Sequence, residues 1–107
     1  MQLTAKKCVA CEGDVAPLDR VEAEVLLRQI PGWSVSNDAT AILRTYTFKN
    51  FAQALAFVNT VGAVAESEGH HPDIELGWGR AKITLTTHAI KGLSENDFIV
   101  AAKVDAK

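Results

Sequence analysis

The segment from residue 50 to residue 71 constrains the fold most, because a long helical pattern stops there and an extended one begins. Apolar residues recur at helical spacing and place on one stripe Phe51, Leu55, Val58, Gly62 and Ala65. Gly69 is a typical C-terminal stop, and Pro72 moves His71 out of helical geometry. The sequence therefore predicts a helix over residues 50–69 and a helix-to-strand junction at two adjacent histidines.

Capping patterns predict a helix on either side of this one. Asp19 can cap a helix over residues 20–30, whose apolar positions keep helical spacing until the Pro-Gly pair at 31–32 stops it. Near the end of the chain, Ser94 and Asp97 form a capping-box pattern in front of apolar residues at helical spacing. We therefore expect the chain to close with a helix.

Period-two patterns predict two hairpins, one before and one after the long helix. Residues 33–48 contain two runs typical of strands around Asn37 and Asp38. Residues 73–78 and 81–88 alternate apolar and polar side chains and are joined by a turn at residues 77–80. Short connections favour antiparallel pairing. We predict an α+β fold of order α-β-β-α-β-β-α, a four-stranded antiparallel sheet with helices packed on one face.

The N-terminal residues do not share these patterns. A chain of 107 residues has the size of one domain. Residues 1–17 lack periodicity and are expected to form a loosely held arm outside the core, so that the domain proper spans residues 18–107. The arm carries Cys8 and Cys11, a single C-x-x-C pair that cannot complete a four-cysteine zinc site within one chain. We interpret this pair as inert or accessory; the alternative is a metal site shared between subunits or completed by a histidine.

Composition and charge argue against several classes of function. The apolar fraction of 48% and the charged fraction of 22% are typical of globular proteins. A formal net charge of −2 argues against a broad surface for nucleic acid. No uninterrupted apolar stretch reaches the roughly 20 residues of a membrane helix, and no secretory signal is recognisable. We therefore expect a cytoplasmic protein without direct nucleic-acid or membrane partners.

Three histidines, His70, His71 and His88, are the candidate catalytic residues. An imidazole titrates near neutral pH and can donate from one nitrogen while it accepts at the other, which suits proton transfer. A lone histidine is more often an ordinary surface residue, but three at element ends favour a shared function. We place His88 on the polar side of its strand, in register with Thr84 and Thr86. Adjacent histidines rarely ligate one ion and no zinc-binding spacing is present, so we expect no metal.

Other candidate residues have both a structural and a functional interpretation. Asp97 can cap its helix or face a pocket from the buried side of the first turn. Glu66 and Glu68 are most simply solvated, but acids at a helix C-terminus oppose the helix dipole, which favours a second role for at least one of them. Trp78 is either a core or interface residue or a flat surface on which a planar ring stacks.

The spacing of these residues resembles the signature of a known family. The pattern consists of Glu66, His70, His71, Pro72, Trp78, His88 and Asp97. It looks like that of the pterin-4a-carbinolamine dehydratases, a family also known as a dimerisation cofactor of a homeodomain transcription factor. The resemblance runs from about Leu18 to Val104 and leaves out the cysteine-bearing arm.

The resemblance implies an enzyme that converts 4a-hydroxytetrahydrobiopterin to quinonoid dihydrobiopterin and water during tetrahydrobiopterin recycling. It implies no metal and no organic cofactor, a small-molecule pterin as substrate, and a homodimer or homotetramer. His70, His71 and His88 would carry the acid–base work. We favour His70 and His71 for the departing hydroxyl and proton transfer, with His88 holding or polarising the pterin, although the sequence does not separate these assignments.

The resemblance also implies a set of substrate contacts. The pocket would be formed by Gly69, His70, His71, Thr86, Thr87, His88 and Ala89. Asp97 would orient an imidazole or bind the ring, Trp78 would shape the wall, and Glu66 would complete the site. Some members of the family have an aspartate where this chain has Gly69, so acidic assistance from that position is not expected here.

Two other functions are compatible with the same fold. One is a non-catalytic binding or assembly factor, as in the dehydratase-like proteins associated with Rubisco assembly. The other is a transcriptional coactivator that acts through helix pairing with a partner protein. Loss of the histidines would favour the assembly factor. Because all three histidines are present, we favour the enzyme.

Overall fold

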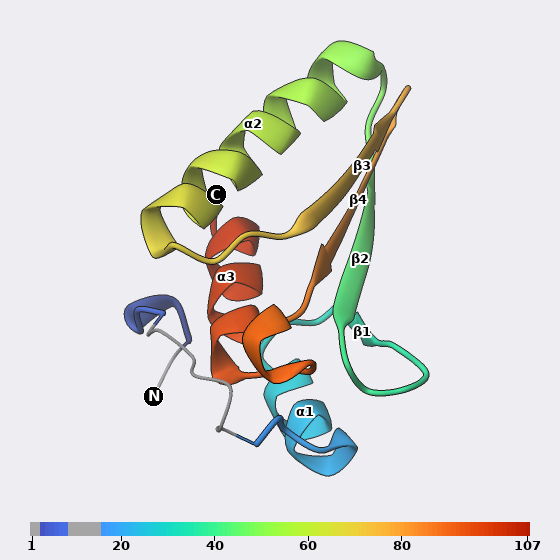
Figure 1. Cartoon of the computed structure of the whole chain (residues 1–107). Helices are drawn as coiled ribbons and strands as arrows, with labels where there is room; N and C mark the ends of the chain where they lie inside the picture. The colour runs from blue at the N-terminus through green and yellow to red at the C-terminus, as the bar shows by residue number, and fades with distance from the viewer. Residues whose placement is uncertain (1–2, 9–15) are drawn as a thin grey trace.

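The chain alternates helices and strands in the predicted order (Figure 1). The computed structural model describes residues 3–8 and 16–107. The helices are α1 (Arg20–Leu27), α2 (Phe51–Glu68) and α3 (Glu95–Asp105), with 3₁₀ turns η1 (Leu3–Ala5) and η2 (His88–Ile90). The strands are β1 (Ser34–Val35), β2 (Ile42–Thr47), β3 (Asp73–Gly77) and β4 (Arg80–Leu85). The predicted α+β class is confirmed.

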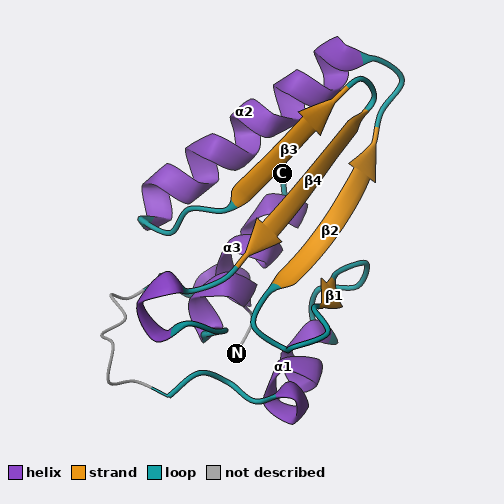
Figure 2. Cartoon of the chain, turned by 45° about the vertical axis from the view of Figure 1, so that its right-hand side comes forward, coloured by secondary structure: helices purple, strands orange, loops and turns teal. Residues whose placement is uncertain are grey.

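The strands form one antiparallel sheet in the order β1-β2-β4-β3. β4 is therefore the inner strand between β2 and β3, and it is joined to β3 by the short turn at Trp78 and Gly79. α2 and α3 lie on the same face of the sheet, while α1 lies at its end, next to β1 (Figures 1 and 2). Within the described residues, no helix combines the length and the apolar character that crossing a membrane requires.

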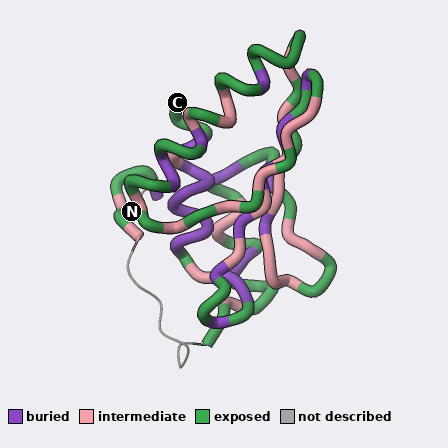
Figure 3. Tube along the Cα trace, turned by 45° about the horizontal axis from the view of Figure 1, so that its top comes forward, coloured by how far each residue is buried: buried purple, intermediate pink, exposed green. Residues whose placement is uncertain are grey.

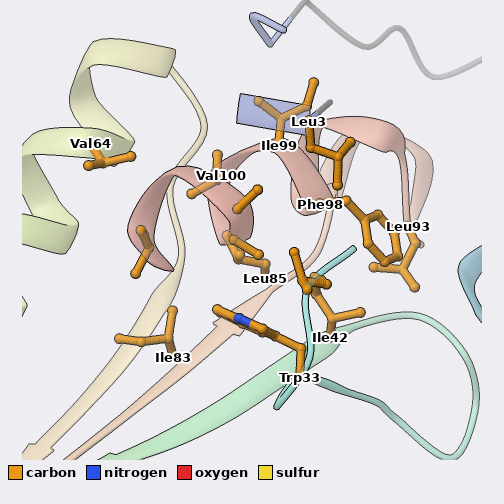
Figure 4. Close-up of a cluster of buried hydrophobic side chains, with 14 of the residues drawn as sticks. Leu3, Trp33, Ile42, Val64, Ile83, Leu85, Leu93, Phe98, Ile99 and Val100 are labelled. Atoms are coloured by element: carbon orange, nitrogen blue, oxygen red, sulfur yellow. The ribbon is translucent and has the colours of Figure 1, made fainter. Parts of the chain in front are cut away.

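The core lies between the sheet and α3. Ile83 and Leu85 of β4 are fully buried and lie with Phe98 and Val100 of α3 in one apolar cluster (Figure 4). Every residue of α3 from 96 to 102 is buried, because the sheet, α2 and the N-terminal residues surround it (Figure 3). Complete burial of such side chains contributes about 1.5–3 kcal/mol each to the free energy of unfolding. The start of α3 is therefore a rigid support for functional groups.

The structure corrects the predicted limits of the first helix and the first hairpin. α1 ends at Leu27 instead of residue 30, because the next amides bond three residues back: Gln29 to Leu26 and Ile30 to Leu27. This tighter winding is common where a helix ends just before a proline. β1 has only two residues, so the first hairpin is much shorter than the predicted run.

The fully buried residues of α2 share only Ala65 with the predicted apolar stripe. Phe51 and Leu55 are 44% and 40% exposed, whereas the buried residues are Ala54, Val61, Val64 and Ala65. On this side α2 contacts α3, β3 and β4. Helical spacing alone does not show which of two neighbouring apolar stripes faces the core.

Residues 3–8 belong to the packed structure, contrary to the expectation of a loose arm. Leu3 is 2% exposed and lies in the core cluster, and η1 packs against α3. The backbone N–H of Cys8 donates to Glu68 Oε1 at 2.9 Å. Contacts with distant elements therefore hold residues 3–8, although this segment has no periodicity of its own. Cys11 lies outside the described residues.

Candidate functional site

A cavity of about 530 Å³ lies where α2 ends, β4 ends and α3 begins. This volume lies within the range of small-molecule sites. The residues predicted as substrate contacts that line it are Gly69, His70, His71, Thr86, Thr87, His88 and Ala89. Cys8, Glu68 and Asn96 also line it, and they were not among the predicted contacts. The fold thus brings the two predicted halves of the site together and adds a third group of residues.

The backbone at Gly69 displays the two adjacent histidines. Gly69 ends α2 in the left-handed conformation, with a φ of 66°, and the amide of His70 then bonds back to the carbonyl of Ala65 at 3.2 Å. A Cβ on Gly69 would meet no atom within 4 Å, so backbone conformation and not space favours glycine there. Aspartate is one of the few other residues that tolerate this conformation.

His70 is held by a buried carboxylate. Its Nε2 lies 2.5 Å from Asp97 Oδ1, and the two side chains are 13% and 0% exposed. Asp97 reaches this position from the first turn of α3, while His70 comes from the junction after α2. Such an imidazole has little freedom to rotate, as catalytic proton transfer requires.

Asp97 has both of the roles that the sequence left as alternatives. Its Oδ2 accepts from the backbone N–H of Ser94 at 3.0 Å, which closes the predicted capping box. The same oxygen accepts from the Thr87 hydroxyl at 2.9 Å, and Ser94 Oγ lies 2.7 Å from Thr87 Oγ1. Oδ1 is thereby left for His70. Capping by one oxygen and orientation of the imidazole by the other are compatible.

This network determines which nitrogen of His70 is directed to each partner. When Asp97 is ionised, its carboxylate can only accept hydrogen bonds. His70 therefore donates from Nε2–H to Asp97. In the neutral ring, Nδ1 is then the nitrogen that can accept a proton.

His71 has a more exposed carboxylate partner. Its Nε2 lies 2.7 Å from Glu66 Oε1, and these side chains are 63% and 80% exposed. An exposed pair of this kind holds its geometry weakly. The structure therefore gives the two adjacent histidines different environments, one rigid and one close to solvent.

His88 reaches the cavity by a route different from the predicted one. β4 ends at Leu85, so His88 is not on the polar side of a strand but begins η2. The chain turns because Thr87 and Gly92 form a two-way backbone bridge, at 2.9 Å and 3.4 Å, and Lys91 adopts a φ of 55°. Among the described residues, no ion pair involves His88. Its position on the strand was wrongly predicted, whereas its place in the cavity lining agrees with the prediction.

Trp78 does not reach this cavity within one chain. It lies at the tip of the turn between β3 and β4 and is 74% exposed. The strand alternation placed it with Ile74 and Leu76, but β3 ends at Gly77, so the pattern no longer determines where the indole points. The predicted role in the pocket wall is therefore not seen in the single chain.

Glu68 and Cys8 join the cavity through a partly buried polar cluster. Glu68 Oε2 accepts from Lys103 Nζ at 2.6 Å, which together with the Cys8 amide lowers the pKa of Glu68 below its ordinary value. Burial, together with the neighbouring Glu68, raises the pKa of the Cys8 thiol to about 12. The sequence signal for Glu68 was its unfavourable place in the last turn of a helix. The simpler interpretation, a solvated residue, is wrong for Glu68.

The described residues offer no ready metal site. Within residues 3–8 and 16–107, no group of three or more His, Cys, Asp or Glu side chains is arranged to hold a metal ion. In this part of the chain the two best-defined imidazole contacts go to carboxylates, Asp97 and Glu66. The arrangement therefore provides groups that donate and accept protons within one cavity.

Known proteins resemble this chain over most of its length. The family described as "Pterin 4 alpha carbinolamine dehydratase" matches residues 16–107. A protein of Halorhodospira halophila, provisionally named a pterin-4-alpha-carbinolamine dehydratase, is 58% identical over 106 residues, which are 99% of this chain and 97% of that protein. A protein of Methylococcus capsulatus with the same provisional name is 52% identical over 103 residues, or 96% of this chain and 90% of that protein.

Solved structures show the same likeness. A transcriptional coactivator/pterin dehydratase from Brucella melitensis has a TM-score of 0.79 and 33% identity, and the match covers 84% of this chain and 96% of that one. A pterin dehydratase-like protein described as a RuBisCO assembly factor in the alpha-carboxysome has a TM-score of 0.61 and 30% identity, covering 70% and 87%. The match over residues 16–107 and the near full-length relatives show that the chain belongs to the pterin 4 alpha carbinolamine dehydratase family.

Proposed function

We propose that the chain dehydrates 4a-hydroxytetrahydrobiopterin to quinonoid dihydrobiopterin and water in the recycling of tetrahydrobiopterin. The single observation that carries the proposal is the buried Asp97 that orients His70 in a cavity also lined by His71 and His88. Family membership supports the substrate class, since close relatives bear the name of this dehydratase.

The reaction requires two proton transfers. The carbon–oxygen bond at position 4a breaks as the hydroxyl takes up a proton and leaves as water, and a ring nitrogen loses a proton as its lone pair forms the new double bond. A positioned acid and a positioned base each accelerate such a step by about 10²–10⁴-fold. One proton is given to the substrate and one is taken from it, so the total charge of the histidines is unchanged, and proton exchange between the rings or with water restores each of them.

We assign the proton transfers to His70 and His71. Each has a carboxylate partner, Asp97 or Glu66, that stabilises the imidazolium formed during turnover. His88 lies at the start of η2 and lines the same cavity as His70 and His71. It is assigned to hold or polarise the pterin ring. Thr87 supports this arrangement indirectly, because its hydroxyl donates to Asp97.

The direct test is the absorbance change on mixing the purified chain with freshly generated 4a-hydroxytetrahydropterin. We expect the wild type to dehydrate it at least about 10²-fold faster than the double variant His70→Ala, His88→Ala. If the two proteins react at the same rate, the chain is not a dehydratase. Binding without turnover would then favour an assembly factor or coactivator.

We further propose that the protein acts in the cytoplasm as a homodimer or homotetramer. The observation in support is the number of large apolar side chains that the single chain leaves exposed, namely Val21, Val25, Phe51, Leu55 and Trp78. Val21 and Val25 lie one helical turn apart on α1, as do Phe51 and Leu55 on α2, and exposed apolar surface often marks a site of association. The expected result is a mass in solution, measured by light scattering, of two or four chains, and a monomeric mass would contradict it.

A further inference from the structure

The last turn of α2 carries a carboxylate that the proposed chemistry does not use. Glu68 Oε1 accepts from the backbone N–H of Cys8 at 2.9 Å, and Oε2 accepts from Lys103 Nζ at 2.6 Å. The Glu68 and Lys103 side chains are only 10% and 19% exposed. One side chain of α2 thus joins α3 to the N-terminal residues at the edge of the cavity.

At neutral pH the ionised carboxylate of Glu68 stabilises its contacts with Lys103 and the Cys8 amide. Because the bonds to Lys103 and the Cys8 amide lower the pKa of Glu68 in the folded chain, its stabilising effect is fully present above the ordinary pKa of a glutamate. The effect is lost as the pH falls through the lower folded value. A charged acceptor that is largely shielded from water forms stronger hydrogen bonds than a neutral one.

The segment 3–8 is anchored at both of its ends. At one end, Leu3 is 2% exposed in the core cluster. At the other, Cys8 is bound through its amide to Glu68, and its Sγ donates to the Asn96 carbonyl at 3.6 Å. Figure 1 shows the segment beside the C-terminal end of α2 and the start of α3. Between the anchors, Lys6 forms a more exposed pair with Glu95 at 2.6 Å.

We propose that Glu68 is a positioning residue that holds residues 3–8 as one wall of the cavity, where Cys8 contacts the bound pterin. Both Cys8 and Glu68 line the cavity together with His70 and His71. A thiol that stays protonated at neutral pH offers an uncharged, polarisable surface and does not act as a nucleophile. The identity of the ligand rests on the proposed function, whereas the wall itself rests on the contacts of Glu68.

Steady-state kinetics separate this role from a catalytic one. Glu68→Ala removes the acceptor for the Cys8 amide and for Lys103, so residues 3–8 are no longer held at the cavity. We therefore expect KM to rise about tenfold while kcat changes less than about twofold. Glu68→Gln keeps an oxygen for the Cys8 amide but loses the charge, so its KM should rise less. Cys8→Phe keeps the amide bond but fills the cavity, so it should also raise KM. The dissociation constant of 7,8-dihydrobiopterin, measured by fluorescence, should follow KM.

Lys6→Gln is the matched control. It removes a different polar contact of the same segment, but Lys6 and Glu95 are not in the cavity lining. An exposed pair contributes about 0–1 kcal/mol, so KM should stay within about twofold of the wild type. An unchanged KM in both Glu68→Ala and Cys8→Phe, with wild-type circular dichroism, overturns the proposal. So does a fall in kcat at constant KM.

A second measurement tests whether Glu68 holds residues 3–8 in place, even if the chain does not dehydrate the pterin. In a Cys11→Ser background, the rate of Cys8 alkylation by iodoacetamide reports on the segment. Because burial and Glu68 raise the thiol pKa, Glu68→Ala should increase this rate about tenfold, whereas Lys6→Gln should not. Equal rates in all three proteins would show that Glu68 does not hold the segment, whatever the substrate is.

Discussion

Replacement of His70 by Ala is expected to lower kcat by about 10²–10⁴-fold, the range for loss of a positioned acid or base. His70 has the only imidazole among the described residues that is paired with a fully buried carboxylate, at 2.5 Å from Asp97. The packed first turn of α3 fixes this carboxylate, so the imidazole needs no reordering before it reacts. The measurement is kcat from steady-state dehydration at saturating substrate.

His71→Ala is the matched comparison for this result. His71 is adjacent in sequence, lines the same cavity and also has a carboxylate partner, but the pair is mostly exposed. We expect kcat to fall by about tenfold or more, but by less than in His70→Ala. A larger loss in His71→Ala would show that the buried pair is structural, and unchanged turnover would remove His71 from the mechanism.

Replacement of Asp97 by Ala is expected to lower the free energy of unfolding by about 3–5 kcal/mol, as for a buried pair that loses one partner. Three donors lose their acceptor at once, namely Ser94 N–H, the Thr87 hydroxyl and His70 Nε2–H. Each buried donor left without a partner costs about 1–3 kcal/mol, which is partly recovered where water enters the site. The measurement is the midpoint of urea unfolding at constant m-value.

Glu66→Ala is the control for the stability of Asp97→Ala. It removes the carboxylate partner of the other histidine from the same junction, but Glu66 is 80% exposed, so the expected change is within about 0.5 kcal/mol. Asp97→Asn provides a graded intermediate, because the amide keeps an oxygen acceptor. Equal stability of Asp97→Ala and Glu66→Ala would mean that water replaces the Asp97 contacts, and the proposed orientation of His70 would fail.

The elements that could be predicted are those whose signals are local. Asn50 and Gly69 bound α2 as expected, with the Asn50 side chain accepting from Gln53 N–H at 2.8 Å. The Ser94 and Asp97 capping box was confirmed in the same way. A cap involves residues three or four apart, so its energy is determined by the nearby sequence in almost any fold.

The buried side of α2 and the path to His88 could not be predicted in this manner. Phe51 and Leu55 are as apolar as the core requires, yet they are exposed because the sheet packs against the neighbouring small residues. His88 lies on η2 because Thr87 pairs with Gly92 across a loop. Both outcomes depend on which surfaces meet, and periodicity within one segment does not contain that information.

For the site, the sequence by itself determined the residue types and the family signature. The paired histidines at a helix end, the third histidine after the last strand and the acid at the start of α3 can all be read from spacing. Only the tertiary structure decided which carboxylate holds which imidazole, and that the N-terminal residues form part of the cavity. The reason is distance along the chain: Cys8 and Glu68 are 60 residues apart and His70 and Asp97 are 27 apart, so only packing of the core brings their polar atoms within bonding distance.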